Sequence, residues 1–471
     1  MGRLSGLALL GSLLGCGGTS AEPMAAGSTG EAGSGVGESA SSEGSSAADS
    51  GSTGGGESGG SSTAEMPLQP AEWLLMDTVI FYDGYAETVD APTPEGVVRL
   101  SNAVNAVRLT DAQLDVIQPH LRLDVLIGAL CDNYDRIGSV NLALTDKGVE
   151  TYDPAVATRL EVGRFITPFM NKNREPDTVP YSWEIDGVAE ILRDPSIRER
   201  YDVWFELDVF GVPYAANTEV SGCEGRNDVF RGWLGLATDS TAPARGFDTL
   251  IPLAMKEPFN DYQEGASDAI GTTRKTIAVE LDAPLQQAEL VLITSNHGAN
   301  VGGEEYVRRD HFMYFDETLV LEYRPGRPSC EPFREYNTQA NGIYGPSPMT
   351  DAQWQSFSNW CPGDVIDTRI VELGALEAGT HSFVIDVPEA VFADDQGDFP
   401  LSLRLQGAEA HSGLVCGLAL RRTRPTKAQT RPAALRASRP SPKARTPTGR
   451  SRRATAALLY RAATEMFQPA R

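Results

Sequence analysis

The stretch from Gly163 to Phe169 reads GRFITPF, and a second block, WEIDGV (Trp183 to Val188), follows it. Around these blocks, several segments alternate between apolar and polar residues with a period of two, which is typical of β-strands with one buried face. The alternating segments are His120 to Ile127, Thr276 to Leu281, His311 to Phe315, Thr318 to Tyr323, His381 to Val387 and Leu401 to Leu405. Candidate helices are short; two TDAQ blocks, from Thr110 and Thr350, match a capping box. The pattern predicts an all-β protein of the jelly-roll or β-sandwich class.

The part of the chain that carries these strands is too long for one ordinary sandwich and fits two. We expect an N-terminal jelly roll over residues 75–240 and a C-terminal jelly roll over 245–410, side by side and joined near the segment TDSTAPARGFD. Asp316 and Glu317 separate two of the predicted strands and should form the turn of a β-hairpin.

Residues 1–16 have the pattern of a bacterial lipoprotein signal. Arg3 supplies a positive charge, a short apolar run follows, and Leu-Leu-Gly precedes Cys16. This predicts an exported protein anchored to a membrane by a lipid on Cys16, either at the outer membrane or cell surface or in the periplasm. A plain secretory signal with an incidental cysteine is the alternative.

Both ends of the mature chain are of low complexity. Residues 17–66 are rich in Gly, Ser and Glu and predict a disordered acidic linker, since they cannot bury enough apolar surface to fold. Residues 421–471 hold fourteen Lys or Arg and one acid, Glu465, and predict a disordered basic tail. An arm for an anionic glycan, lipopolysaccharide or nucleic acid and a reading-frame artefact are further explanations of the tail. The whole chain carries a net charge of −24, which argues against nucleic acid as a partner of the folded body.

The two blocks at Gly163 and Trp183 resemble the N-terminal domain of the peptide-N-glycosidase F family, and the stretch from Ser295 through NWCPGD (Asn359 to Asp364) to TRI resembles its second domain. The resemblance runs with gaps over roughly residues 75–405. It implies two jelly rolls, which are also similar to the core of the copper-dependent peptidylglycine monooxygenases. It implies hydrolysis of the amide bond between Asn and the first N-acetylglucosamine of an N-glycosylated protein or glycopeptide, without a cofactor.

The same resemblance implies three catalytic acids: Asp135 in CDNYDR, Glu305 in GGEEYVRRDH, and Glu206 in YDVWFELD. Amide hydrolysis needs a base that deprotonates water and an acid that protonates the leaving nitrogen, and clustered carboxylates can fill both roles because they shift one another's pKa. The neighbouring residues expected to hold the substrate or orient these acids are Arg136, Tyr134, Tyr306, Arg309 and His311.

The chain departs from the family where sugar rings should be held. Tyr134, Asp208 and, in a less certain alignment, Asn296 stand where the family has tryptophan, and Phe357 replaces an arginine. Aromatic faces are the usual platforms for sugar rings, so these changes put the identity of the substrate in more doubt than the fold.

Five cysteines follow Cys16, and an exported protein can pair them. The resemblance implies a disulfide between Cys330 and Cys361. Cys131 and Cys223 are a second candidate pair, and Cys416 would be left over.

Two other classes of function stay open. A copper monooxygenase needs two sets of His and Met ligands, but the five histidines include no His-x-His pair, so we expect no metal. A non-catalytic glycan-binding surface lipoprotein would share the fold without the chemistry. Convergence of the three acids in one site would favour the enzyme. We expect the protein to be a monomer.

Overall fold

The computed structural model describes residues 68–258, 269–298, 303–340, 343–355, 359–392, 397, 399–409 and 419–420, all within one compact unit, Met66–Arg471. The predicted signal, linker and basic tail, together with Cys16, Phe357 and Cys416, lie outside the described residues. No helix in the described part of the chain is long and apolar enough to cross a membrane.

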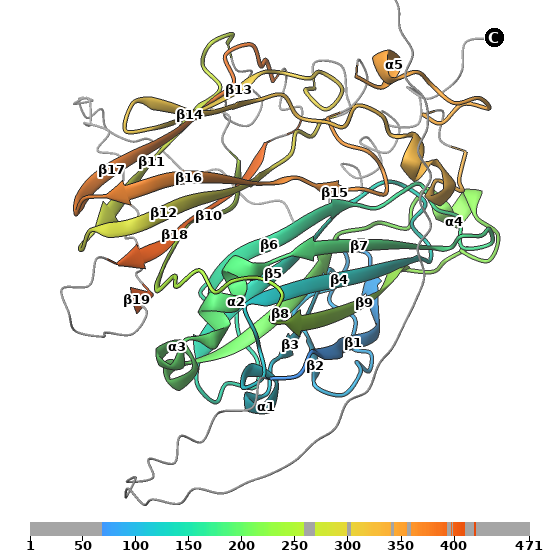
Figure 1. The fold of residues 1–471 in the computed structure, drawn as a ribbon. Coiled ribbons are helices and arrows are strands. Elements are labelled where there is room, and N and C mark those ends of the chain that lie inside the picture. Colours follow the sequence, from blue (N-terminus) through green and yellow to red (C-terminus); the bar gives the residue numbers. More distant parts are fainter. Residues whose placement is uncertain are drawn as a thin grey trace, which may run out of the picture. The chain divides into compact units, whose positions relative to one another are not determined.

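The first half of the described chain forms a sandwich of two antiparallel sheets (Figure 1). One sheet has the order β1 (Ala71–Tyr82), β9 (Asp228–Asp239), β4 (His120–Ala129), β7 (Thr178–Glu184). The other has the order β15 (Val365–Ile366), β6 (Thr158–Ile166), β5 (Ile137–Asp146), β8 (Tyr201–Val209), β3 (Val104–Arg108), β2 (Val97–Arg99). Between them lies one core of alternate apolar side chains, such as Leu123 and Leu234 from the first sheet and Leu142 and Phe205 from the second. Burial of such side chains is the main stabilising term of this half.

The second half forms another sandwich of the same kind. Its larger sheet has the order β16 (Thr368–Leu376), β12 (Leu285–Thr294), β18 (Pro400–Glu409), β10 (Thr249–Pro258), β19 (Ala419–Leu420), in which only β10 and β19 pair in parallel. Its smaller sheet has the order β11 (Arg274–Leu281), β17 (Gly379–Asp386), β13 (His311–Phe315), β14 (Thr318–Tyr323). A separate core fills the space between these sheets, with Leu290, Leu403, Phe383 and Ile385 among its members. The fold is therefore all-β with two sandwich domains, as the sequence predicts.

Short helices connect the strands. They are α1 (Asp111–Leu114), α2 (Asp186–Arg193), α3 (Pro195–Arg200), α4 (Ala216–Glu219), η1 (Glu331–Tyr336) and α5 (Asp351–Gln355). Thr110 caps α1 through the predicted capping box, in which the Gln113 backbone N–H donates to the Thr110 hydroxyl and the Gln113 side chain accepts from the Thr110 N–H. Thr350 and Gln353 repeat the arrangement at α5.

The predicted hairpin joins β13 to β14. Asp316 and Glu317 both have positive φ, 47° and 64°, which is the backbone of a tight hairpin turn and is strained for residues with a Cβ. The Asp316 carboxylate accepts from the Ser382 N–H at 2.8 Å and from the His381 ring at 2.6 Å, so the turn is tied to β17.

The GRFITPF block is one of the places where the second sandwich contacts the first. Gly163 lies against the Trp183 ring, and a Cβ there would come within 2.7 Å of it. Arg164 is buried and donates to the Glu161 carboxylate, to the Ser295 hydroxyl at 2.9 Å and to the Pro400 carbonyl at 2.8 Å. The two-residue strand β15 from the second half pairs with Phe165 and Arg164 of β6. The block therefore joins the two halves.

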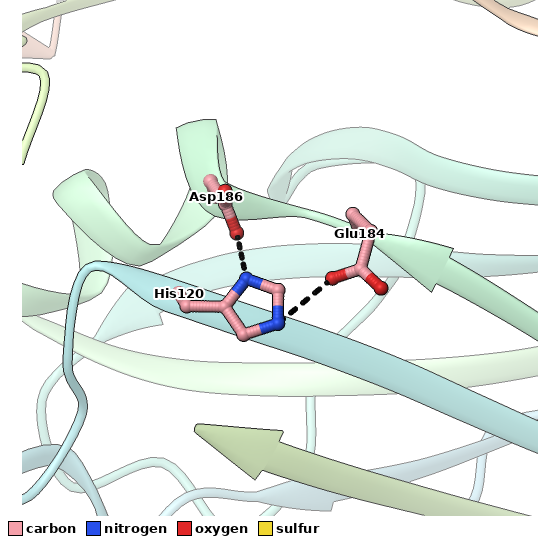
Figure 2. A group of neighbouring side chains, drawn as sticks. All are labelled: His120, Glu184 and Asp186. Atoms are coloured by element: carbon pink, nitrogen blue, oxygen red, sulfur yellow. Dashed lines mark hydrogen bonds and ion pairs between the residues drawn. The ribbon is translucent and has the colours of Figure 1, made fainter. Parts of the chain in front are cut away.

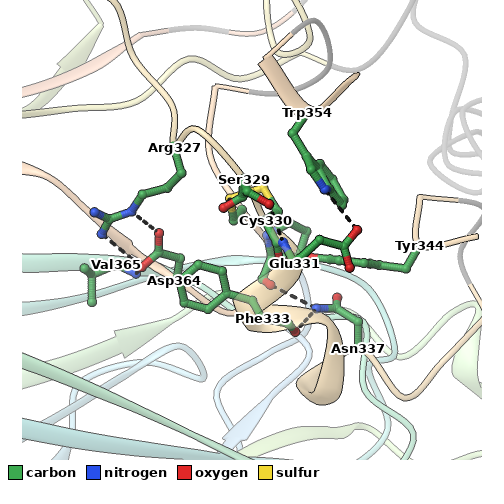
Figure 3. The surroundings of a disulfide bond; sticks show 12 residues. Arg327, Ser329, Cys330, Glu331, Phe333, Asn337, Tyr344, Trp354, Asp364 and Val365 are labelled. Carbon is green, nitrogen blue, oxygen red and sulfur yellow. Dashed lines mark hydrogen bonds and ion pairs between the residues drawn. A yellow bond between two sulfur atoms is a disulfide. The ribbon is translucent and has the colours of Figure 1, made fainter. Parts of the chain in front are cut away.

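Both predicted disulfides are formed, Cys330–Cys361 and Cys131–Cys223, with Cα atoms 5.3 and 5.5 Å apart. Figure 3 shows the surroundings of Cys330–Cys361, where Trp354 donates to the Glu331 carboxylate and Arg327 pairs with Asp364. The loop closed by this bond also contacts the first sandwich, because the Phe169 N–H donates to the Asn337 side chain at 3.0 Å. This disulfide thus stabilises a segment that packs on the GRFITPF block.

Candidate active site

Asp135 lies in the loop between Cys131 and β5, and the buried Asp132 fixes that loop. The Asp132 carboxylate accepts from the Tyr134 N–H at 3.0 Å, from the Val212 N–H at 2.7 Å and from the Arg136 guanidinium at 2.6 Å. The loop is also attached to the GRFITPF block, because the Arg136 N–H donates to the Thr167 hydroxyl at 2.8 Å. Asp135 is therefore presented from a backbone that is held on both sides.

Glu305 lies in the segment between β12 and β13 and is also held. Its carboxylate accepts from the Gly298 N–H at 3.2 Å and from the Tyr306 side chain. Its backbone carbonyl accepts from the Asn359 side-chain amide at 2.5 Å, and its N–H donates to the Gly298 carbonyl at 3.3 Å. Because Asn359 is two residues from Cys361, the Cys330–Cys361 disulfide stabilises the support of Glu305.

Asp135 and Glu305 lie close enough to affect one another electrostatically. Burial, and after it the Glu305 carboxylate, raise the pKa of the Asp135 carboxyl to about 8. Burial also raises the pKa of Glu305, although the hydrogen bonds from Tyr306 and the Gly298 N–H oppose the rise. The pair is thus unequal, because Asp135, with a pKa of about 8, keeps a proton at neutral pH, while Glu305 accepts two hydrogen bonds that favour its ionised form. An acid and a base in one place are what hydrolysis of an amide requires.

The two arginines of the predicted site pair with the neighbours of these acids. Arg136 donates its side-chain hydrogen bonds to Asp132. Arg309 donates to the buried Glu304 at 2.9 and 3.2 Å, and Glu304 also accepts from the Val391 N–H. The side-chain hydrogen bonds of these two arginines thus go to Asp132 and Glu304, while the charge of Arg136 also acts on Asp135 and partly offsets the rise in its pKa. Each arginine fixes the loop that carries its acid.

Glu206 is placed differently from the other two acids. It is fully buried on β8, where its carboxylate pairs with Arg159 and accepts from Tyr152 at 2.8 Å and from Asn141 at 2.9 Å. Asn141 is its partner across the sheet, six residues beyond Asp135, which corresponds to roughly 20 Å of extended chain. The structure therefore brings Asp135 and Glu305 together and gives Glu206 a separate set of partners.

The two tyrosines of the predicted site both lie near the acid pair. Tyr134 is half-buried, 5.7 Å from the Phe169 ring between centroids, and the Arg136 guanidinium lies 5.7 Å from its ring. The Tyr306 hydroxyl donates to Glu305, and burial together with Glu305 and Asp135 raises its pKa. Tyr306 therefore adds a hydroxyl donor to the acid pair.

His311 does not join this group. It is fully buried at the start of β13, stacked on Tyr323 at 4.7 Å and on Phe399 at 5.7 Å, and its Nδ1 faces the Arg309 carbonyl at 3.0 Å. Burial lowers its pKa to about 3, so it is neutral. The expectation that His311 contacts substrate is not supported by this position, because its side chain has no exposed surface.

Two of the positions that depart from the family pattern also lie in the described residues. Asp208 pairs with Lys256 at 2.7 Å, and Lys256 also contacts the Ser139 hydroxyl. Asn296 is fully buried, and its carboxamide has no hydrogen-bond partner among the residues that the structure describes. Leaving a buried amide without hydrogen-bond partners costs roughly 1–3 kcal/mol. An unpaired buried amide of this kind is therefore a candidate for binding a ligand or a water molecule.

Sequence reasoning missed several residues that build the site. Asp132, Glu304 and Asn359 position the acid loops, and a chain of hydrogen bonds leads from Arg164 to Ser295 and on to His297 at 2.7 Å. Burial lowers the pKa of His297 to about 3, so this imidazole is neutral. Single acidic or amide residues carry no local signal that separates them from solvated ones, so only the three-dimensional contacts identify them.

One group of potential metal ligands stands outside this site. His120, Glu184 and Asp186 offer ligand atoms within 4.8 Å of one another. Figure 2 shows that the two carboxylates face different ring nitrogens, with Asp186 3.0 Å from Nδ1 and Glu184 3.1 Å from Nε2. Asp186 also accepts from the Leu121 N–H, so the group ties the start of α2 to β4. Opposed nitrogens do not direct three ligands at a single ion, and among the described residues no other such group is present.

The structure thus defines a protein of two antiparallel β-sandwiches that carries a pair of unequal carboxyl groups, Asp135 and Glu305. Family models for the N-terminal and C-terminal domains of peptide-N-glycosidase F match residues 74–224 and 266–406, together more than half of the chain. The chain belongs to the peptide-N-glycosidase F family.

Solved structures of this fold are similar to the chain at low sequence identity. The structure of PNGF-II is 17% identical with a TM-score of 0.50, and the match covers 72% of this chain and 66% of that one. This chain thus spans slightly less than two thirds of PNGF-II. PNGase F, a glycosylasparaginase from Flavobacterium meningosepticum, is 13% identical with a TM-score of 0.46, over 73% of this chain and 97% of that one. No curated protein sequence matches the chain.

Proposed function

We propose that this protein is an amidase that cleaves the bond between Asn and the first N-acetylglucosamine of an N-glycosylated protein or glycopeptide. The observation that carries the proposal is the unequal acid pair of Asp135 and Glu305, each held by its own loop. Family membership supports the same reaction class. The identity of the glycan depends on the altered positions around the pair and is left to experiment.

In this reaction water adds to the side-chain carbonyl carbon of Asn, and the bond from that carbon to nitrogen breaks. The nitrogen leaves with the sugar as a glycosylamine after gaining one proton, and the peptide keeps Asp. Asp135 holds a proton at neutral pH and donates it to the leaving nitrogen. Glu305, kept in place by Tyr306 and the Gly298 N–H, acts as a carboxylate that orients the attacking water and accepts its proton.

A release assay with the full chain tests this proposal. A denatured glycopeptide should yield intact glycan and a peptide in which Asp replaces Asn. Asp135→Asn should abolish release by removing the ionisable group while keeping the shape, and Glu305→Gln should lower it comparably. The matched controls are the exposed acids Asp90→Asn and Glu322→Gln, which should react as wild type. Failure of the wild-type chain on a panel of N-glycans would favour a non-catalytic glycan-binding protein.

We also propose that the protein is exported and carries a lipid on Cys16. Support comes from Arg3, the apolar run and the Leu-Leu-Gly that precede this cysteine. Detergent phase partitioning of the protein from cells should place wild type in the detergent phase and Cys16→Ala in the aqueous phase. Equal partitioning of the two would leave only a secretory signal.

A further inference from the structure

A hollow of about 600 Å³ lies on the outer face of the four-stranded sheet of the first sandwich. Strands β4 and β9 form its floor. Their core-facing side chains include Leu123, Val125, Leu234 and Leu236, so the alternate residues, Asp124, Leu126, Trp233 and Gly235, project to the opposite face. The hollow is therefore on the outer face of this sheet, whereas Asp135 lies in the loop that joins the end of β4 to β5 in the other sheet.

The floor is organised in two rows that run across the strands. In one row, Leu74, Gly235, Asp124 and Ser182 are cross-strand neighbours. In the next row, Trp233, Leu126 and Pro180 are neighbours. The rows are two residues apart along each strand, roughly 7 Å. The polar residues of the first row, Asp124 and Ser182, thus lie beside the apolar second row at a spacing that one sugar ring can bridge.

The groups in these rows are held in fixed orientations. The Trp233 indole N–H donates to Asp77 at 3.1 Å, which fixes the ring that lines the hollow. The Asp124 carboxylate accepts from the Arg122 side chain at 2.9 Å and from the Ser182 hydroxyl at 2.7 Å. The Trp233 ring and the Asp124 carboxylate are therefore already oriented before a ligand binds. Less conformational entropy is then lost on binding.

The depth of the hollow depends on Gly235, which has no side chain to fill the space above the first row. The nearest atom to a Cβ at this position would be the Trp73 carbonyl oxygen at 3.3 Å, so the face above the glycine is open. Leu74 at the edge is 60% exposed and lines the hollow together with Trp233 and Leu126, so three apolar side chains are available there to a ligand.

We propose that this hollow binds a neutral saccharide, as a site separate from the acid pair. Hydroxyl groups of a sugar are donors that suit the Asp124 carboxylate, and the CH face of the ring suits Trp233 and Leu126. Glu72 and Asp124 place two carboxylates at the hollow against the single guanidinium of Arg122, which pairs with Asp124, so the remaining negative charge opposes an anionic sugar.

Other occupants fit this surface less well. A peptide strand cannot add to the floor, because β4 and β9 are central strands whose backbone groups already pair on both sides. An acyl chain would bury the Asp124 carboxylate against hydrocarbon. The chain's own linker, residues 17–66, has almost no large apolar side chain that could fill an apolar hollow.

The test is a titration of the ¹⁵N-tryptophan-labelled full chain with trimers of N-acetylglucosamine, mannose and glucose. The six indole N–H signals report separate places in the protein, and Trp233→Phe assigns the relevant one. At least one trimer should shift the Trp233 signal saturably with a Kd on the order of 1 mM. Gly235→Val, which fills the hollow, should weaken this binding about tenfold or more. Trp233→Ala, followed by calorimetry, should do the same without a bulky insertion.

The exposed Leu319→Ala on β14 is the control for removal of an apolar side chain and should bind as wild type. Asp135→Asn should also leave the Trp233 shift unchanged, which separates this site from the proposed reaction. No shift with any trimer, or an undiminished shift in Gly235→Val, overturns the proposal. A Trp233 shift that depends on protein concentration alone also overturns it, because the hollow would then bind a second copy of the chain.

Discussion

Replacing Asp135 by Asn should stabilise the protein, and the gain should grow as the pH rises. The folded state raises the pKa of this carboxyl from 3.8 to about 8, so between these values the folded protein keeps a proton that the unfolded chain has released. The contribution of Asp135 to stability is therefore fully present below about pH 4 and is lost as the pH rises towards 8. Asn has the same shape and no proton to lose, so the variant escapes this penalty.

The size of the effect follows from 1.36 kcal/mol for each unit of pKa. Between pH 5 and pH 8 the shift corresponds to at most about 3–4 kcal/mol, and the partial exposure of Asp135 reduces the expectation to roughly 2 kcal/mol. The assay is urea unfolding of wild type and Asp135→Asn at both pH values. The difference between the two proteins should increase by that amount, whereas Asp90→Asn should show no such increase. If the difference in unfolding free energy between the two proteins stays constant or shrinks with rising pH, the folded protein does not raise the pKa of the Asp135 carboxyl.

Three further predictions concern stability. Glu206→Gln should lower the free energy of unfolding by roughly 3–5 kcal/mol, because it leaves the Arg159 guanidinium without its charge partner; chemical denaturation measures this, and an unchanged midpoint would contradict it. Mutating Cys330 and Cys361 to Ser should cost about 4 kcal/mol, the value for a loop closed over 31 residues; calorimetry tests it, and a melting temperature equal to wild type would show that the bond adds nothing. Glu317→Gly should stabilise the hairpin by about 0.5–1 kcal/mol through relief of its positive φ, and a lower melting temperature would count against it.

The strands could be predicted because their signals are local and repeated, whereas the Cys330–Cys361 disulfide followed from the resemblance to the family. Alternation predicted strands in both sandwiches, and the hairpin at Asp316 and Glu317 followed from the two strands that flank it. The strand β15 could not be predicted, since Val365 and Ile366 are only two residues and their partner β6 lies 200 positions away in the chain. Such a contact depends on how the halves meet, which periodicity does not encode.

The acids of the candidate site could be predicted from the sequence, but most of their partners could not. Asp135 and Glu305 stand in blocks that resemble a family, and the structure places them near one another. The partners of Arg136 and Arg309 were not predictable, because each arginine has more than one acid within a few residues and sequence spacing does not choose between them. The burial of Glu206 by Arg159 likewise depends on strand register, which a single sequence leaves open.

The measurement that tests the proposed chemistry most directly is cleavage of a glycopeptide in ¹⁸O-labelled water, followed by mass spectrometry of the peptide. If Asp135 and Glu305 hydrolyse the side-chain amide, the former Asn becomes Asp and carries one ¹⁸O atom, and Asp135→Asn gives no product. A peptide that keeps N-acetylglucosamine on its Asn, or that stays uncleaved with every N-glycan tried, would contradict the assignment, as would wild-type rates in Asp135→Asn.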